Sequence, residues 1–236
     1  AEFSKWAVEM IERRFGKLKK QALPFTYLGV RHQKLPIGHF FLDQAPYLEK
    51  LQPVVIQPHR AKQDSSPLVP AEHFSFRSLL CSMLWLCLTR LDLLSDIITL
   101  QQEMVSPMMA HLKQLNIVLK RAVKDGVLCG LHFHRLEFPL KVMGIGDSSA
   151  ATKISVYAQE GKLALLMSDA VRTNDLPEWI EAADCQKFAG YGHPLYFSAK
   201  KAGRVSHSTS HAESLAAVGT TQVAQLLAMR LTEPFV

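Results

Sequence analysis

Two acidic residues stand where a carboxylate could do chemistry, and the first is Asp147. It follows the mostly apolar run 142–146 and precedes Ser148 and Ser149. A carboxylate at the end of a buried strand, beside small residues, can reach a metal ion. Asp and Ser are also ordinary residues of the turn that closes a strand, and turn statistics favour this simpler interpretation by about five to one.

The second acid, Glu213, lies at the start of an Ala- and Leu-rich stretch that predicts a long helix over 210–230. Ser210 and Glu213 have the spacing of a capping box, in which both side chains satisfy amide groups at the helix N-terminus. The same Glu213, pointing inward from the first turn, would instead be placed to bind a metal ion. The pattern leaves both roles open.

Histidine pairs are a third candidate for metal chemistry. His207 and His211 are four residues apart and would share one face of a helix, and His132 and His134 would point the same way from a strand. The zinc-protease motif requires Glu beside its first His, but this chain has Ser208 there. Without a third convergent ligand, solvated or hydrogen-bonded histidines are the favoured interpretation.

The elements that must position these residues follow a mixed α+β order. Predicted helices cover 6–20, 44–51, 74–104 with a break near 90–92, 108–124 and 210–230. Strands are expected at 25–30 and 38–42, paired as a hairpin around a turn at 34–36, and at 127–133, 140–145, 154–158, 163–167 and 195–198, with a turn at Gly161. The proline-rich residues 52–72 predict a linker or an extended loop.

Composition excludes several classes of protein. Of 236 residues, 48% are hydrophobic and 20% charged, which suits a chain with a packed core and not a disordered one. No apolar stretch approaches the ~20 residues of a membrane span, and no glycine-rich phosphate loop or nucleophile elbow occurs. The four cysteines form no C-x-x-C pair, which favours reduced thiols and an intracellular location. The sequence begins without Met, as a piece of a longer protein would.

The basic surplus is concentrated at the N-terminus. Residues 1–62 contain 11 Lys and Arg against 5 Asp and Glu, which equals the net charge of +6 of the whole chain. Such an excess suggests a polyanionic partner such as nucleic acid, although charge alone is more often a solvated helix face. The candidate phosphate-contacting residues are Arg13, Arg14, Lys17, Lys19 and Lys20.

Several stretches, taken in order, resemble the pol polyprotein of copia-type LTR retrotransposons. FGKL at 15–18 and FTYLGV at 25–30 resemble the segment that follows the catalytic Asp-Asp pair of its reverse transcriptase. LDQAPYL at 42–48 resembles L-x-Q-x-x-Y-[IL], and FRSLLCSMLWL with TRLDL at 76–93 resembles Y-R-S-L-[IL]-G-S-L-x-Y-L with T-R-P-D-I. SAKK at 198–201 and STSHAE at 208–213 resemble W-x-S-K-K-Q and S-S-x-E-A-E-Y-x-A of its RNase H domain.

The resemblance implies three parts. Residues 1–62 would be the end of the reverse-transcriptase palm with a primer-grip-like hairpin, 63–126 a helical thumb- or connection-like region, and 127–236 a truncated RNase H-like domain with an incomplete mixed sheet and a helix. It also implies that Asp147 and Glu213 match two acids of a cluster that holds two Mg²⁺ or Mn²⁺ ions and cleaves RNA in an RNA–DNA hybrid. Two ions ~4 Å apart can activate water and stabilise the leaving oxygen.

The chain departs from the family where catalysis would be decided. The polymerase Asp-Asp pair would precede Ala1, so no polymerase activity is expected, and the later RNase H acids would follow Val236. Leu91 replaces the family's Pro, and Ser149 and Ala150 stand in the region of its second acid and Trp. Residues 169–192 are a long insertion for the family, and Asp169 within it is a further candidate ligand.

Two hypotheses follow from the resemblance. The first is a metal-dependent RNase H-type module with a basic segment that holds the hybrid backbone. The second is a remnant without catalysis that binds nucleic acid or has a structural role as a subunit of a larger assembly. A protein partner would then cover the apolar helix 74–104 and the open sheet edge left by the missing strands. We favour the resemblance for ancestry and the remnant for present activity.

Overall fold

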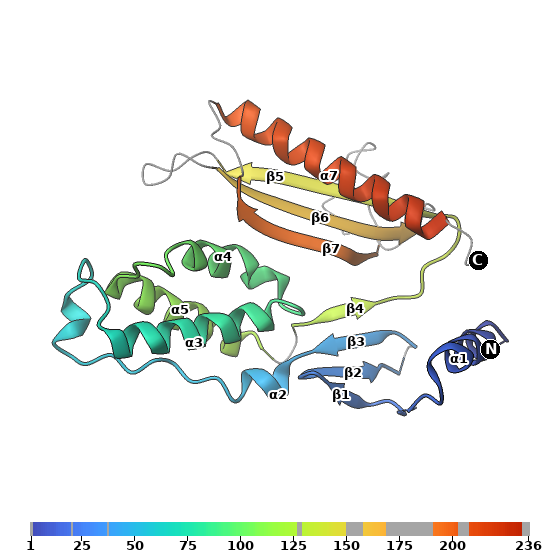
Figure 1. The fold of residues 1–236 in the computed structure, drawn as a ribbon, viewed down its shortest axis with the longest axis horizontal. Helices are drawn as coiled ribbons and strands as arrows, with labels where there is room; N and C mark the ends of the chain where they lie inside the picture. The colour runs from blue at the N-terminus through green and yellow to red at the C-terminus, as the bar shows by residue number, and fades with distance from the viewer. Residues whose placement is uncertain are drawn as a thin grey trace.

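The computed structural model describes residues 2–19, 21–36, 38–126, 129–149, 158–168, 191–202 and 208–232. These residues form six α-helices and two antiparallel sheets, one of four strands and one of three (Figure 1). The predicted α+β class is therefore confirmed. Every described strand pair is antiparallel, so the mixed sheet predicted for the C-terminal part is not seen within the described residues.

The N-terminal helix α1 (Glu2–Phe15) begins and ends earlier than the predicted helix over 6–20. Gly16 ends it, because its φ of +84° places it in the left-handed region while its N–H bonds to the carbonyl of Glu12 at 2.9 Å. The helix lies at one end of the molecule (Figure 1), and its apolar Trp6 and Phe15 are 45% and 74% exposed. This helix is therefore not part of the main core.

The four-stranded sheet has the order β1–β2–β3–β4, with β1 (Phe25–Tyr27), β2 (Val30–Lys34), β3 (Phe40–Asp43) and β4 (Leu131–Phe133). The single hairpin predicted between 25–30 and 38–42 is wrong. Leu28 and Gly29 both have positive φ, 48° and 79°, and such a two-residue turn reverses the chain at once. Residues 30–34 thus become a middle strand, and the expected turn near 34–36 joins β2 to β3.

Helices α3 (Pro70–Leu86), α4 (Leu94–Gln102) and α5 (Met109–Lys124) enclose the main hydrophobic core. The predicted break near 90–92 is confirmed, because the short helix η2 (Leu91–Leu93) separates α3 from α4. Residues 45–69 connect the sheet to this bundle through the short helices α2 (Ala45–Leu48) and η1 (Arg60–Lys62). The side chains that are 2% exposed or less include Phe76, Leu80, Met83, Leu86, Leu93, Ile97, Leu112 and Leu115.

A buried carboxylate fixes the point where the sheet passes into α2. Asp43 is 1% exposed and accepts hydrogen bonds from Arg31 Nε and Nη2, both at 3.0 Å, and from Gln33 Nε2 at 2.8 Å. It also accepts the backbone N–H of Ala45 at 2.9 Å. These bonds satisfy both oxygens of the Asp43 carboxylate, whose charge would otherwise be costly to bury.

Gln44 and Arg90, in the segments 42–48 and 76–93, also form hydrogen bonds that join parts of the fold. Gln44 accepts a hydrogen bond from Thr89 Oγ1 at 2.9 Å and donates to the carbonyl of Trp85 at 3.3 Å. Arg90 makes two bonds to Asp92, at 2.9 and 2.8 Å, and one to the carbonyl of Ala122 at 3.0 Å. Gln44 therefore ties the segment after β3 to the end of α3, and Arg90 ties η2 to α5.

The three-stranded sheet has the order β5–β6–β7, with β5 (Leu140–Ser149), β6 (Gln159–Ser168) and β7 (Gly192–Lys201). The long helix α7 (Thr209–Thr232) covers one of its faces (Figure 1). The turn predicted at Gly161 is wrong, because Gly161 lies inside β6 and pairs with Asp147. Of the strand predicted over 154–158, residues 154–157 lie outside the described residues and Ala158 is not part of a strand. No helix among those described is long and apolar enough to span a membrane.

Candidate functional site

Two glycines show which face of β5 meets α7. A Cβ atom added to Gly146 would lie 2.2 Å from Thr220 Oγ1, and one added to Gly144 would lie 2.9 Å from Thr220 Cγ2. Both positions therefore face the helix. Because side chains alternate between the two faces of a strand, Asp147 faces the opposite side of the sheet.

The surroundings of Asp147 agree with this assignment. Asp147 is exposed and accepts the N–H of Ser148 at 2.8 Å. It borders a small hollow of about 220 Å³ that also involves Ser149, Glu160 and Gly161 of the sheet and Ser95 of α4. Among the described residues, none of those that line this hollow belongs to α7.

Glu213 lies on α7, beside the buried stripe of the helix but not in it. Ala212 and Ala216, one turn apart, are 2% and 0% exposed and form the buried stripe of the helix, whereas Glu213 is exposed. The capping box at Ser210, one of the two roles left open for Glu213, is not formed, because Ser208 caps the helix by accepting the N–H of His211 at 3.1 Å. The structure does not bring Glu213 and Asp147 together.

The ionic residues beneath α7 are instead Glu160 and Lys162 on β6. Glu160 pairs with Ser148 and Lys162 with Gly146, so both lie on the helix-facing side of the sheet. Lys162 Nζ lies 3.3 Å from Glu160 Oε2, and the two side chains are only 11% and 9% exposed. A Cβ atom added to Gly219 of α7 would lie 2.1 Å from Lys162 Nζ, so the helix directly covers the ammonium group.

Sequence reasoning missed this ion pair because it placed a turn at Gly161. The alternation Glu160-Gly161-Lys162 would have indicated two charges on one face of a strand if the strand had been extended through the glycine. Two hydroxyl oxygens on the same sheet face, Ser148 Oγ and Ser198 Oγ, are buried without a hydrogen-bond partner in the structure described.

These residues do not fit a centre for two divalent ions. Such a centre needs several carboxylate oxygens converging on one point, but Asp147 and Glu213 are on different sides of the β5–β6–β7 layer. Across the described part of the chain, no three His, Cys, Asp or Glu residues are arranged to hold a metal ion. Asp169, the further candidate ligand, lies outside the described residues.

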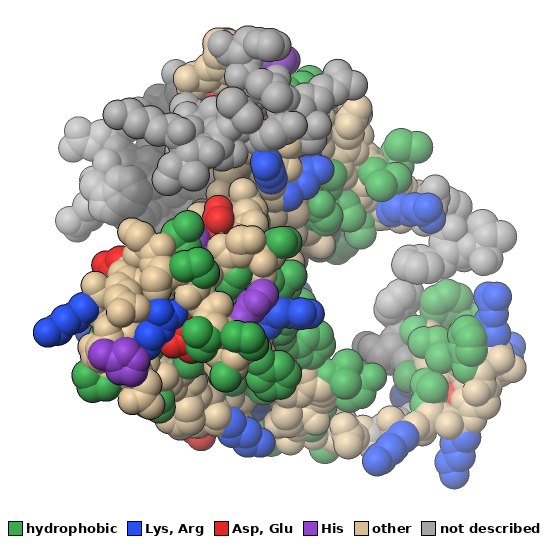
Figure 2. Space-filling model, turned by 60° about the vertical axis from the view of Figure 1, so that its left-hand side comes forward, with side chains coloured by type: hydrophobic (Ala, Val, Ile, Leu, Met, Phe, Trp, Pro, Cys, Tyr) green, Lys and Arg blue, Asp and Glu red, His purple; other side chains and the backbone are tan. Residues whose placement is uncertain are grey.

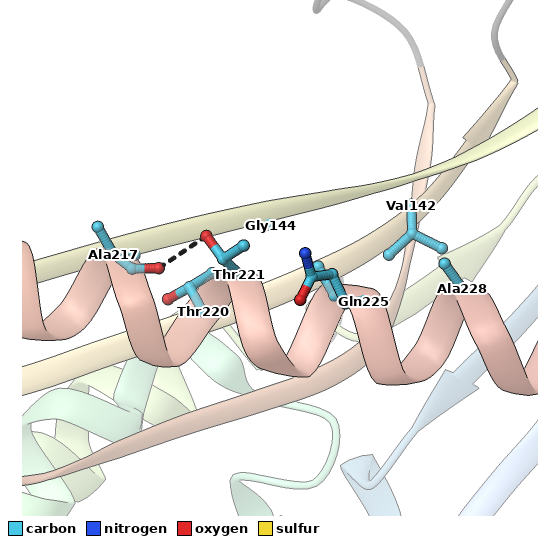
Figure 3. Close-up of a pocket in the computed structure, with 9 residues that line it drawn as sticks. Val142, Gly144, Ala217, Thr220, Thr221, Gln225 and Ala228 are labelled. Atoms are coloured by element: carbon cyan, nitrogen blue, oxygen red, sulfur yellow. Dashed lines mark hydrogen bonds between the residues drawn. The ribbon is translucent and has the colours of Figure 1, made fainter.

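A groove does run between α7 and β5, but its lining is nearly neutral. Its volume is about 440 Å³, and Figure 3 shows Gly144 and Val142 of the strand beside Thr220, Gln225 and Ala228 of the helix. The remaining lining residues are Gly146, Ala217, Thr221 and Ala224. Without a charged side chain in its lining, this groove offers no group for acid–base or metal chemistry.

The candidate phosphate-contacting residues lie on and after α1. Arg13, Arg14, Lys17 and Lys19 are all exposed, and Lys20 lies outside the described residues. Figure 2 shows Lys and Arg side chains around the apolar side chains of this end of the molecule, at its lower right. Arg14 also lies over the ring of Phe15, 5.6 Å from its centroid. These cations are therefore accessible to a polyanion.

The predicted histidine pairs have different outcomes. His207 lies outside the described residues, and His211 lies in the first turn of α7. His132 and His134 share one face of the β4 segment, and their ring centroids are 6.1 Å apart. Two further histidines, His39 and His193, lie close to this second pair.

The face assignment predicts different costs for two glycine substitutions in the same sheet. Gly146→Ala should lower the free energy of unfolding by about 1–3 kcal/mol, because its Cβ atom would overlap Thr220 and approach the carbonyl oxygen of Ala216. Gly161→Ala, on the Asp147 side, is the matched control, because its nearest atom would be 3.9 Å away, and it should cost less than ~1 kcal/mol. Urea unfolding would measure both, and equal costs would contradict the assignment.

Comparisons with models of protein families, with curated proteins and with solved structures gave no match to this chain.

Proposed function

We propose that this chain is a retroelement-derived, RNase H-like module that holds nucleic acid without cleaving it. The proposed ancestry is supported by the order of the family-like motifs and by three antiparallel strands followed by a helix on one sheet face. A helical region and a small sheet precede them in the chain, as a thumb- or connection-like part and a primer-grip-like hairpin would.

The observation that carries the loss of cleavage is the position of the charges around the β5–β6–β7 sheet. Asp147 faces away from α7, and the carboxylate that does face α7, Glu160, is paired with Lys162 at 3.3 Å. The ammonium group already neutralises that carboxylate and would repel a divalent cation placed nearby, an effect that low solvent exposure strengthens. Cleavage with Mg²⁺ or Mn²⁺ on Asp147 and Glu213 would require the two acids to come to one side of the sheet.

The basic N-terminal residues support nucleic acid as the partner. Exposed Arg and Lys side chains contact phosphates without reading sequence, and such contacts weaken as salt displaces them. An RNA–DNA hybrid is the proposed ligand, held through its backbone. We further propose that a protein partner covers the edge of β5, because β5 is an outer strand of the described sheet.

Hybrid binding measured at several salt concentrations tests this proposal. The affinity should fall as salt rises, and Arg13→Gln with Arg14→Gln should weaken binding and reduce the salt slope by about 1–2. Lys120→Gln with Lys124→Gln removes the same charge from exposed positions of α5 and should leave the slope unchanged. No binding, or equal losses in both double variants, would contradict the proposed interface and favour a structural role.

A further inference from the structure

Four histidines gather where the two sheets meet. His39 precedes β3, His132 and His134 belong to β4 and its end, and His193 lies on β7. The ring centroids of His39 and His134 are 4.2 Å apart, and His134 stacks on Tyr191 at 3.9 Å. We call this group, with Tyr191, the histidine seam.

The seam joins the edge strand of one sheet to the edge strand of the other. β4 is the last strand of the four-stranded sheet, and β7 is the last of the three-stranded sheet. Phe133 of β4 also packs edge-on against His193 of β7, with centroids 5.2 Å apart. The contact across the seam therefore consists largely of aromatic and imidazole rings.

Three imidazole nitrogens of the seam are buried without a hydrogen-bond partner among the described residues. They are Nδ1 of His39, Nδ1 of His134 and Nε2 of His193. In a neutral imidazole such a nitrogen can be the unprotonated one, which carries a lone pair and no hydrogen. In a protonated imidazole both nitrogens carry hydrogens, so each of these three would become a buried donor with no acceptor, which is costly.

We propose that the histidine seam is a pH-dependent contact, which holds the two sheets together while His134 and His193 are neutral and releases them when these two imidazoles are protonated. Protonation of either one adds a buried donor without an acceptor among the described residues and a positive charge close to other imidazoles. Within the described residues, the three-stranded sheet also contacts α4, because β7 packs against this helix and Gln159 of β6 bonds to Thr99 and Ser95 at 3.1 and 3.4 Å. These hydrogen bonds involve no titratable group and do not change with pH.

Most of the groups around His134 and His193 lower the pKa values of these two histidines. Burial lowers the pKa of His134 below 6.5, and the charges of His39, His132 and His193 lower it further. Burial also lowers the pKa of His193, against a smaller opposing effect of its hydrogen bond to the backbone of His134. No carboxylate is among the described groups that shift either pKa.

The sign of the pH dependence follows from these shifts. Because the closed seam lowers the pKa of both histidines, the open form binds more protons than the closed form. The seam therefore contributes its full stability above pH 6.5, the ordinary pKa of histidine, and loses it as the pH falls through the lowered values. With two such histidines, the equilibrium constant for opening should rise by more than about tenfold per pH unit in that range.

Titration of the full chain from pH 8 to pH 4.5 tests the proposal, with the imidazole resonances followed by NMR and the radius of gyration by small-angle scattering. We expect His134 and His193 to titrate below pH 6.5 and together with an increase in the radius, while helical circular dichroism is retained. His134→Phe keeps an aromatic ring in the seam and should remove most of the increase. His59→Phe, at an exposed position outside the seam, should leave it intact.

Three results would overturn the proposal. The first is independent titration of these histidines near pH 6.5 at constant radius. The second is an expansion of His134→Phe over the same pH range as the parent chain. The third is an expansion that coincides with the loss of helical signal, which would be unfolding of the whole chain. If His134→Phe does not fold, the titration of the parent chain still tests the proposal. It distinguishes the expected expansion with retained helical signal from titration at constant radius and from unfolding of the whole chain.

Discussion

Replacing Lys162 by Met is expected to lower the free energy of unfolding by about 3–5 kcal/mol. Lys162 and Glu160 are 11% and 9% exposed and lie beneath α7. The pair as a whole contributes little, because the attraction between the charges roughly offsets the loss of their hydration. Removing Lys162 alone leaves the Glu160 carboxylate buried and unpaired, and this is the origin of the large expected effect.

The double variant separates this mechanism from loss of packing. Lys162→Met combined with Glu160→Leu removes both charges and should recover most of the stability that Lys162→Met loses, because apolar residues of similar size replace a buried pair at little cost. Chemical denaturation would measure all three chains. A cost below ~1 kcal/mol for Lys162→Met, or no recovery in the double variant, would show that the two charges are not coupled beneath the helix.

Replacing Arg31 by Met is expected to cost about 2–3 kcal/mol, because the buried Asp43 loses its charged partner, although the Arg31 side chain itself is 35% exposed. Arg31 makes two of the four hydrogen bonds that Asp43 accepts, and Asp43 is 1% exposed. Without the guanidinium group, Asp43 keeps only Gln33 and one backbone N–H as partners for a buried charge. Urea unfolding of the variant would give the loss directly.

Two further variants on β2 define the control for this result. Lys34→Met removes a positive charge from the exposed end of the same strand and should change stability by less than ~0.5 kcal/mol. Arg31→Lys keeps the charge but loses the two parallel bonds, so its stability should lie between those of Arg31→Met and Lys34→Met. Equal stability of Arg31→Met and Lys34→Met would contradict a structural role for the Asp43 network.

The helical part of the fold is readable from the sequence because its signals are local. The apolar period over 108–124 and the break near 90–92 reappear as α5 and η2. The bounds of the strands were harder to predict, because two local features of the backbone determine them. The positive φ of Leu28 allowed a tight turn that composition did not indicate, and Gly161 continued a strand that glycine usually interrupts.

The candidate site was less predictable because it depends on the phase of one strand. Side chains alternate with a period of two, so the face that Asp147 occupies is set by whether 146 or 147 meets α7. Gly146 meets it, since only a residue without a Cβ atom leaves room for Thr220 there. The sequence names the acid but carries no signal for this packing. Glu160 and Lys162 then follow from the register of β6 with β5.

We propose that the chain does not cleave RNA–DNA hybrids, because Asp147 and Glu213 lie on two sides of the β5–β6–β7 sheet. The most direct test is incubation of a labelled hybrid with the chain in Mg²⁺ and then in Mn²⁺, beside Asp147→Asn and Glu213→Gln. We predict no cleavage above background in either metal and no difference between the parent chain and the variants. Metal-dependent cleavage that both substitutions abolish would contradict the account and establish a nuclease.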